Sequence, residues 1–258
     1  MAYDGIGQRL LLFGGSSRAA MNDTWTFGAA GWSEIQTSLA PGRRALAAAS
    51  TDPGNGSILL FGGSGVNDTW QWDGRWSQQT DSSAPPVLID DTARMAFDPF
   101  AHAEILLGTP NSTLPNERPQ VHAWQWTGTE WAAIAPSSTG PAPRLATALT
   151  TDPLDGGVLL FGGSGAGPGG VTDLNDTWLL KAGTWTQLTP PTKPSAGAAY
   201  AAFDEAQKVV VLLTQDGRTW TWSNSDWRLA ASAGPAGRYY GSMAYDPAHQ
   251  RSSMEERP

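Results

Sequence analysis

The placement of tryptophan is the feature of this sequence that most restricts its possible folds. Of the 13 tryptophans, ten form five pairs whose members stand six or seven residues apart. The pairs are Trp25 and Trp32, Trp70 and Trp76, Trp124 and Trp131, Trp178 and Trp185, and Trp220 and Trp227. The remaining Trp72, Trp126 and Trp222 each follow the first member of a pair by two residues. Such regular use of the largest side chain predicts five copies of one structural unit, each built around the same anchor.

A second marker recurs at a fixed distance inside every copy. An aspartate stands nine residues before a large apolar residue in the pairs Asp4 and Phe13, Asp52 and Phe61, Asp98 and Leu107, Asp152 and Phe161, and Asp204 and Leu213. Two glycines follow each of the three phenylalanines, and successive copies are 46 to 54 residues apart. A constant offset inside a variable period indicates a rigid hairpin in each unit, with the length differences confined to loops.

Composition excludes several classes of function. The net charge of −8 disfavours nucleic acid and anionic membranes as partners, because both reward basic surfaces. The chain has no cysteine, which excludes disulfides, thiolate metal sites and cysteine nucleophiles. No apolar run approaches the roughly 20 residues of a membrane-spanning helix, so we expect no membrane insertion.

Each copy contains four segments typical of short strands. The first, as in residues 45–50 and 145–150, ends at an Asp-Pro or equivalent turn signal. The second is an apolar run, and such a strand is buried on both faces. The five runs are residues 9–13, 58–61, 104–107, 158–161 and 209–213. The third carries the first tryptophan of the pair, and a short turn leads to the fourth, which opens with the second tryptophan.

These segments predict an all-β protein, since no part of the chain shows a sustained period of 3.6 residues. Strands buried on both faces and one heavy aromatic anchor per unit favour blades stacked around an axis over a two-layer sandwich. The prediction is therefore a β-propeller of about five four-stranded antiparallel blades.

Three copies share a longer motif that resembles a known family. Phe-Gly-Gly, then Asn-Asp-Thr-Trp, then a tryptophan six or seven residues on is similar to the kelch repeat of galactose-oxidase-like β-propellers. The Asn-Asp-Thr-Trp segments are residues 22–25, 67–70 and 175–178. The resemblance covers essentially the whole chain and implies a propeller. The copper oxidases of this fold need a cysteine-linked tyrosine, which a chain without cysteine cannot form.

The predicted domain organisation is a single kelch-type propeller over residues 1–251. Its repeats are residues 1–40, 41–84, 85–138, 139–192 and 193–234, with a closing strand at 237–247 and a non-repeat tail at 252–258. The closing strand has two interpretations. It fills the first-strand position of the first blade, or the chain is a fragment of a six- or seven-bladed propeller.

One end of the blades is the expected binding face. The connections from second to third strands and from fourth strands to the next blade vary in length, whereas the other connections are short and uniform. Length variation gathered at one end indicates a binding surface or neutral drift of loops. The third copy has the longest excursion, with Asn116, Glu117 and Arg118 inside it and His122 at its close. We call this end the variable face and the other the uniform face.

A possible ring of charges lies at the same end. The residues eight positions before the aspartates are Arg44, Asp90, Arg144 and Ala196, and the closing strand adds Arg238. If the repeats superpose, these positions surround the mouth of the central channel, where arginines could hold a carboxylate or a sugar acid. The alternative is that they form ion pairs between blades or face water.

Three functions remain open from the sequence. The first is a non-catalytic module that binds a protein segment or glycan on the variable face through Arg44, Asp90, Arg144, Arg238, Asn116, Arg118 and His122. The second is a carbohydrate-active enzyme that uses Asp90, Asp91 or Glu117 for acid–base chemistry. The third is a structural repeat of a larger extracellular protein, a location slightly favoured over the cytoplasm. We expect a monomer without cofactor or metal, because no two of the three histidines converge.

Overall fold

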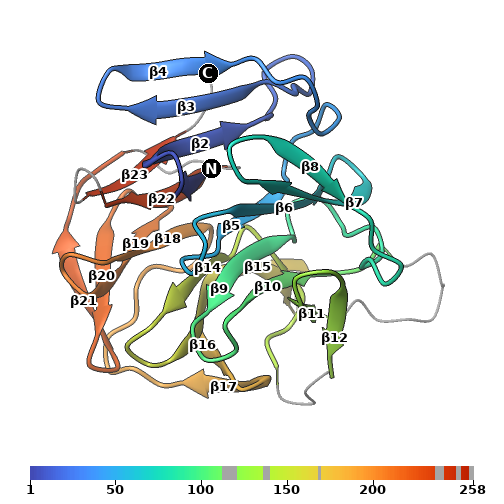
Figure 1. Ribbon diagram of the computed structural model, residues 1–258. Helices are drawn as coiled ribbons and strands as arrows, with labels where there is room; N and C mark the ends of the chain where they lie inside the picture. Colours follow the sequence, from blue (N-terminus) through green and yellow to red (C-terminus); the bar gives the residue numbers. More distant parts are fainter. Residues whose placement is uncertain (112–120, 136–139, 168–169, 236–240, 248–250, 256–258) are drawn as a thin grey trace.

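The chain forms a β-propeller, with blades arranged around a central axis (Figure 1). The computed structural model describes residues 1–111, 121–135, 140–167, 170–235, 241–247 and 251–255. Five antiparallel blades of four consecutive strands account for most of these residues, which confirms the predicted fold. The described residues contain no helix, and so none that could cross a membrane.

The five blades follow one another along the chain. Blade 1 contains β1 (Ala2–Asp4), β2 (Arg9–Phe13), β3 (Thr24–Gly28) and β4 (Gly31–Ile35). Blade 2 contains β5 (Ala48–Thr51), β6 (Ile58–Gly63), β7 (Val66–Trp72) and β8 (Trp76–Gln79). Blade 3 contains β9 (Arg94–Asp98), β10 (Ala103–Gly108), β11 (His122–Trp126) and β12 (Trp131–Ile134). Blade 4 contains β14 (Ala148–Asp152), β15 (Gly157–Gly167), β16 (Gly170–Lys181) and β17 (Thr184–Leu188), with the short β13 (Arg144–Leu145) beside β15. Blade 5 contains β18 (Ala199–Asp204), β19 (Val209–Thr214), β20 (Thr219–Ser223) and β21 (Asp226–Ala231).

A sixth, two-stranded sheet closes the ring. It pairs β22 (Ser242–Asp246) with β23 (Arg251–Glu255). The inner strand β22 packs against both β18 of blade 5 and β1 of blade 1. The closing strand therefore does not fill the first-strand position of blade 1, because β1 occupies it and pairs with β2. Part of the expected tail, in turn, belongs to β23.

The inner strands begin later than the sequence pattern indicates. We expected strands over 45–50 and 145–150, but β5 and β14 start at Ala48 and Ala148. Leu46 and Ala146 adopt positive φ angles of 61° and 52°, which an extended strand cannot contain. The turn at these positions brings the preceding arginines back toward their own blades.

The recurring aspartates close the turns on the uniform face. Asp4, Asp98, Asp152 and Asp204 are buried, and Asp52 is half-buried. Each accepts hydrogen bonds from backbone N–H groups two or three residues ahead, as Asp204 does from Ala206 and Gln207 at 3.0 and 2.9 Å. This local hydrogen bonding fixes the turn and explains the constant nine-residue offset.

The glycine pair marks the junction between neighbouring blades. Gly14 has a φ of 62°, and a Cβ there would lie 2.6 Å from the carbonyl oxygen of Arg44, which leads into blade 2. The next residue, Gly15, donates a backbone hydrogen bond to the same carbonyl at 2.9 Å. A side chain at Gly14 would thus meet both a strained backbone and the next blade.

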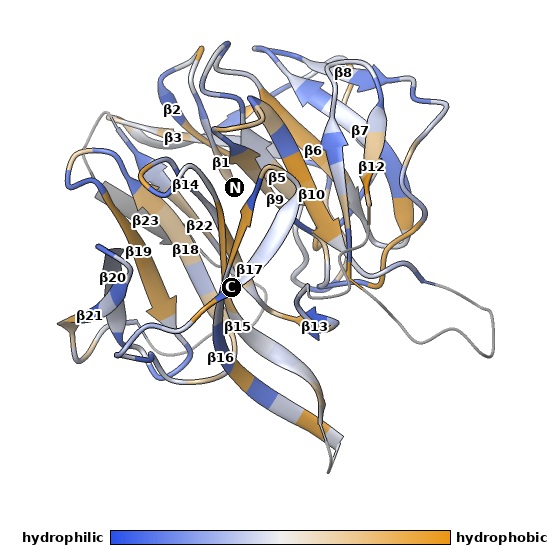
Figure 2. Ribbon diagram, turned by 90° about the horizontal axis from the view of Figure 1, so that it is seen from below, coloured by the Kyte–Doolittle hydropathy of each residue, from blue (hydrophilic) through white to orange (hydrophobic). Residues whose placement is uncertain are grey.

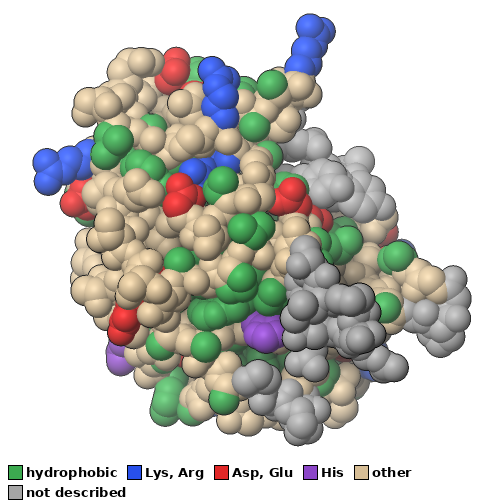
Figure 3. Space-filling model, turned by 90° about the vertical axis from the view of Figure 1, so that its right-hand side faces the viewer, with side chains coloured by type: hydrophobic (Ala, Val, Ile, Leu, Met, Phe, Trp, Pro, Cys, Tyr) green, Lys and Arg blue, Asp and Glu red, His purple; other side chains and the backbone are tan. Residues whose placement is uncertain are grey.

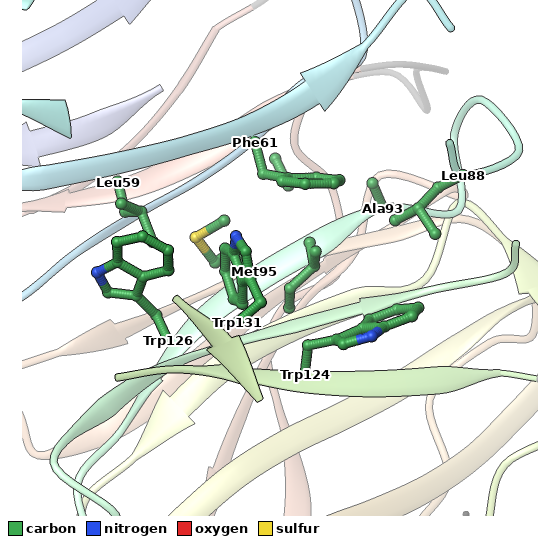
Figure 4. Close-up of a cluster of buried hydrophobic side chains, with 10 residues drawn as sticks. Leu59, Phe61, Leu88, Ala93, Met95, Trp124, Trp126 and Trp131 are labelled. Atoms are coloured by element: carbon green, nitrogen blue, oxygen red, sulfur yellow. The ribbon is translucent and has the colours of Figure 1, made fainter. Parts of the chain in front are cut away.

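The tryptophans at the start of the fourth strands connect consecutive blades. Trp76, Trp131 and Trp227 donate indole hydrogen bonds of 3.0, 2.9 and 3.0 Å to Thr24, Thr69 and Thr177 of the preceding blades. The same three rings pack against Phe13, Phe61 and Phe161, with centroids 5.0 to 5.7 Å apart. Figure 4 shows Phe61 of β6 and Trp131 of β12 in the apolar cluster between blades 2 and 3. These three tryptophans therefore connect consecutive blades, and each also packs against a tryptophan on the third strand of its own blade, namely Trp72, Trp126 or Trp222.

Candidate functional site

The candidate site is the axial channel, which the inner strands line in layers. Two cavities of about 680 and 690 Å³ open at the variable and the uniform face, respectively. Both are lined by the residues three positions before the aspartates, so the cavities meet at this level. These residues are Met1, Ala49, Met95, Leu149, Ala201 and Met243. The channel thus has an apolar waist to which all six inner strands contribute.

Small residues line the channel on the variable side of the waist. Five positions before the aspartates, at or just before the start of each inner strand, stand Ala47, Ala93, Thr147, Ala199 and Gly241. Successive layers differ by two residues because alternate side chains of a strand point to the same face. The polar groups at this mouth come from Ser16, Ser64, Asp90, Asp91, Arg94 and Tyr200.

Two of the predicted ligand-binding arginines form ion pairs with aspartates of the protein itself. The guanidinium of Arg44 is buried and binds both carboxylate oxygens of Asp68, with bonds of 2.5 and 2.9 Å. It also donates to the carbonyl oxygens of Gly42 and Gly62. Arg144 repeats this arrangement with Asp176 at 2.6 and 3.0 Å. The expected ring of free arginines is therefore not present at these two positions, because each guanidinium is neutralised within its own blade.

The aspartates of these pairs belong to the Asn-Asp-Thr-Trp motif. Asp68 and Asp176 also accept indole hydrogen bonds of 2.7 and 2.6 Å from Trp70 and Trp178. Burial by itself would raise the pKa of Asp68. Hydrogen bonds from Arg44 and Trp70, together with the charge of Arg44, outweigh burial and hold the pKa below its usual value. The motif thus links three parts of a blade in one hydrogen-bond network: the arginine before the inner strand, the first glycine at the end of the second strand, and the aspartate and tryptophan of the third strand.

The remaining predicted site residues do not come together as one cluster. Arg238, Asn116, Glu117 and Arg118 lie outside the described residues. His122 begins β11, and its ring stacks on Trp124 at a centroid distance of 5.7 Å. His122 stands two residues before Trp124, at the position that an aspartate holds before the corresponding tryptophan in blades 1, 2 and 4.

Asp90 and Asp91 both line the variable mouth but differ in environment. Asp90 is exposed, whereas Asp91 is buried and forms an ion pair of 2.9 Å with Arg94. Arg94 is further held by the carbonyl oxygens of Ala93 and Thr147. Asp91 has a φ of 64°, an unfavourable conformation for a residue with a side chain. Asp90 is therefore the carboxylate that a ligand at this mouth could reach.

Two features of the site were missed by the sequence analysis. Glu104 of β10 is buried between blades 2 and 3, although it lies inside an apolar run. Aromatic residues also line the channel at the uniform face, where the sequence suggested no site. The sequence does contain a pattern for both: counting positions from the recurring aspartates places Glu104 among aliphatic residues and aligns the aromatic residues with one another.

The outer surface offers no strong charge signal on the side seen in Figure 3. Acidic and basic side chains are scattered among polar and apolar ones on that side of the molecule. A hairpin formed by the outer parts of β15 and β16 extends beyond the other blades (Figure 2). Val171 in this hairpin is 81% exposed.

Comparisons with known proteins support the fold and nothing finer. The sequence matches no protein-family model and no curated protein. Among solved structures 186 chains match, including the structure of YjhT, a propeller. That likeness has a TM-score of 0.54 at 14% identity and covers 90% of this chain and 86% of that chain. The likeness establishes a β-propeller.

Proposed function

We propose that this chain is a kelch-type propeller domain that acts as a non-catalytic binding module. Its ligand is a protein segment or a glycan bound at the mouth of the channel on the variable face. The observation that carries this proposal is the open cavity of about 680 Å³ lined by exposed Asp90 and by hydroxyl groups. The wall of this cavity combines polar and apolar groups, and its volume is in the range of ligand sites.

The charge at this mouth favours neutral or cationic ligands over acidic ones. Asp68 and Asp176 already neutralise Arg44 and Arg144, and Asp91 neutralises Arg94. The carboxylate of Asp90 remains available to accept hydrogen bonds from sugar hydroxyls or from a basic side chain. This replaces the sugar-acid ligand suggested by the sequence with a hydroxyl-rich or basic one.

The enzymatic alternative has weaker support. Asp91, the neighbour of Asp90, is buried and held in an ion pair by Arg94, so its carboxylate is not available to a substrate. The two aspartates are consecutive, so they are not placed on opposite sides of a bond to be cleaved.

A binding screen tests the proposal. The domain is presented to panels of neutral glycans and of basic and acidic peptides, and the affinity of any hit is compared with that of Asp90→Ala. We expect at least tenfold weaker binding for Asp90→Ala and unchanged binding for Glu34→Ala, an exposed carboxylate on β4. Equal affinity for Asp90→Ala and the wild type would contradict the assignment of the site. Turnover of a glycan hit that is lost in Asp90→Asn would favour the enzyme instead.

A further inference from the structure

Aromatic residues form a second layer in the channel, on the opposite side of the waist from the proposed site. One position before each recurring aspartate, the six inner strands carry Tyr3, Thr51, Phe97, Thr151, Phe203 and Tyr245. All six line the cavity of about 690 Å³ that opens at the uniform face. Four of the six are aromatic, and they come from blades 1, 3 and 5 and from the sixth sheet. Among the described residues, no other layer of the channel contains this concentration of aromatic side chains.

The aromatic layer lies next to a ring of carboxyl groups. The recurring aspartates, including Asp246 of β22, follow the six residues directly, at the ends of the inner strands. Their carboxylates accept hydrogen bonds from the turns, and Glu205 adds an exposed carboxylate at the cavity rim. Lys208 is the one lysine or arginine among the described residues that line this cavity.

Burial and the negative charges of these carboxylates raise the pKa of the two tyrosines in the layer, Tyr3 and Tyr245. Burial raises the pKa of Tyr3, and the charges of Asp246, Asp4 and Glu205 raise it further. The pKa of Tyr245 is raised in the same way, by burial and by Asp204, Glu205 and Asp246, against a hydrogen bond from the backbone N–H of Ala206. A field that opposes a negative charge on either phenol favours a positive charge in the space that both line.

We propose that the cavity at the uniform face binds an organic cation with an apolar surface, such as a quaternary ammonium group. Aromatic rings attract such cations through the negative charge of their faces, and the apolar waist accommodates the methyl groups. The surrounding carboxylates stabilise the charge without entering the cavity. A small hydrated cation would lose its water without gaining a set of charged ligands, because Glu205 is the one carboxylate among the described residues that line this cavity.

Choline and its uncharged isostere 3,3-dimethyl-1-butanol distinguish charge recognition from simple filling of an apolar cavity. Their binding to the full chain is measured by calorimetry at low salt. We expect choline to bind at least tenfold more tightly than the alcohol, with an affinity that falls as salt is added. Equal affinities would overturn the proposal in favour of a merely apolar cavity, and binding of neither compound would overturn it as well.

Variants on one turn provide an internal control. Glu205→Gln should weaken choline binding several-fold, and Lys208→Gln should tighten it, since both residues are exposed on the same rim and carry opposite charges. Phe97→Leu should weaken binding at least fivefold while keeping an apolar side chain of similar reach. Glu34→Gln, an exposed carboxylate on β4 that lines neither cavity, should change the affinity by less than twofold. Effects of the same sign for Glu205→Gln and Lys208→Gln, or none for Phe97→Leu, would refute the site.

Discussion

Glu104 is the residue whose environment differs most from that of its equivalents in the other blades. Leu10, Ile58, Val158 and Val210 hold the same position, six residues after the aspartate, and are all buried. Neither carboxylate oxygen of Glu104 has a hydrogen bond of normal geometry from any described residue. Burial therefore raises its pKa to about 8, even though the hydroxyl of Ser50 lies beside it and favours the charged form, while Asp52 raises the pKa further.

This pKa makes the stability of the protein depend on pH. Between about 4.5, the ordinary pKa of the carboxyl group, and about 8, the folded protein keeps a proton that the unfolded chain releases. Stability should therefore fall as the pH rises through this range. Replacing the residue in Glu104→Leu should raise the free energy of unfolding by about 3 to 5 kcal/mol at pH 8 and by much less at pH 4.

Urea denaturation at several pH values checks this prediction. A smaller slope in the same direction should remain below pH 6 in Glu104→Leu, because burial also raises the pKa of Asp152, to about 6. An unchanged pH profile in Glu104→Leu would show that Glu104 is not the titrating group.

Arg44 and Arg144 provide a second prediction at the residue scale. Removing either guanidinium leaves a partly buried aspartate without its partner, which costs about 3 to 5 kcal/mol for a buried pair. The aspartate side chains are 26% and 21% exposed, so we expect values near the lower limit. Since blades 2 and 4 are not neighbours, the effects of Arg44→Ala and Arg144→Ala should add in the double variant within about 0.5 kcal/mol. Chemical denaturation of the three variants measures this, and a destabilisation below 1 kcal/mol would indicate that the arginines are free to bind ligand after all.

At the scale of the strand pair, the contact between blades depends on a threonine hydroxyl. Thr24→Val keeps the shape of the side chain but removes the acceptor of the Trp76 indole, so a buried donor loses its partner. We expect a loss of about 1 to 3 kcal/mol. Thr219→Val is the matched control, because no described residue donates an indole hydrogen bond to the equivalent threonine of blade 5. Thermal denaturation should show a clear decrease for Thr24→Val alone; equal decreases would mean that the hydroxyl acts within its own strand.

Two glycines with positive φ angles allow a similar comparison, one at a blade junction and one away from it. Gly14 and Gly65 both have positive φ angles, 62° and 75°, but a Cβ would clash only at Gly14. Gly65→Ala should therefore cost about 1 kcal/mol for the backbone conformation, and Gly14→Ala should cost distinctly more. Equal losses in unfolding free energy would show that the approach of blade 2 is unimportant.

At the scale of the whole molecule, the ring depends on β22. This strand lies between β18 and β1, and it carries Met243 of the waist and Tyr245 of the aromatic layer. Deleting residues 237–258 should lower the midpoint of thermal unfolding by several degrees and abolish choline binding. Deleting residues 256–258 is the control and should leave both unchanged. If the larger deletion unfolds at the same midpoint temperature as the full-length chain, the five complete blades close without the sixth sheet.

The sequence determined the unit and the class of fold because the relevant spacings act within one unit. The aspartate turn spans a few residues, the glycine pair needs only a local backbone conformation, and the alternation of side chains decides which faces are buried. The tryptophan pairs pointed correctly to a repeat, although the hydrogen-bond acceptors of Trp76, Trp131 and Trp227 are in the preceding blade.

Only the tertiary structure decided which charges are free and where the cavities lie. Arg44 lies just before β5 and meets Asp68 of β7 with β6 between them in the sheet, so no local pattern shows that its charge is neutralised. The aromatic layer needs one residue from each of six strands, and closure of the ring brings together positions about fifty residues apart. Glu104 stands out in the sequence as a charged residue at an aliphatic position, but only the packing of blade 2 against blade 3 shows that its carboxylate is buried.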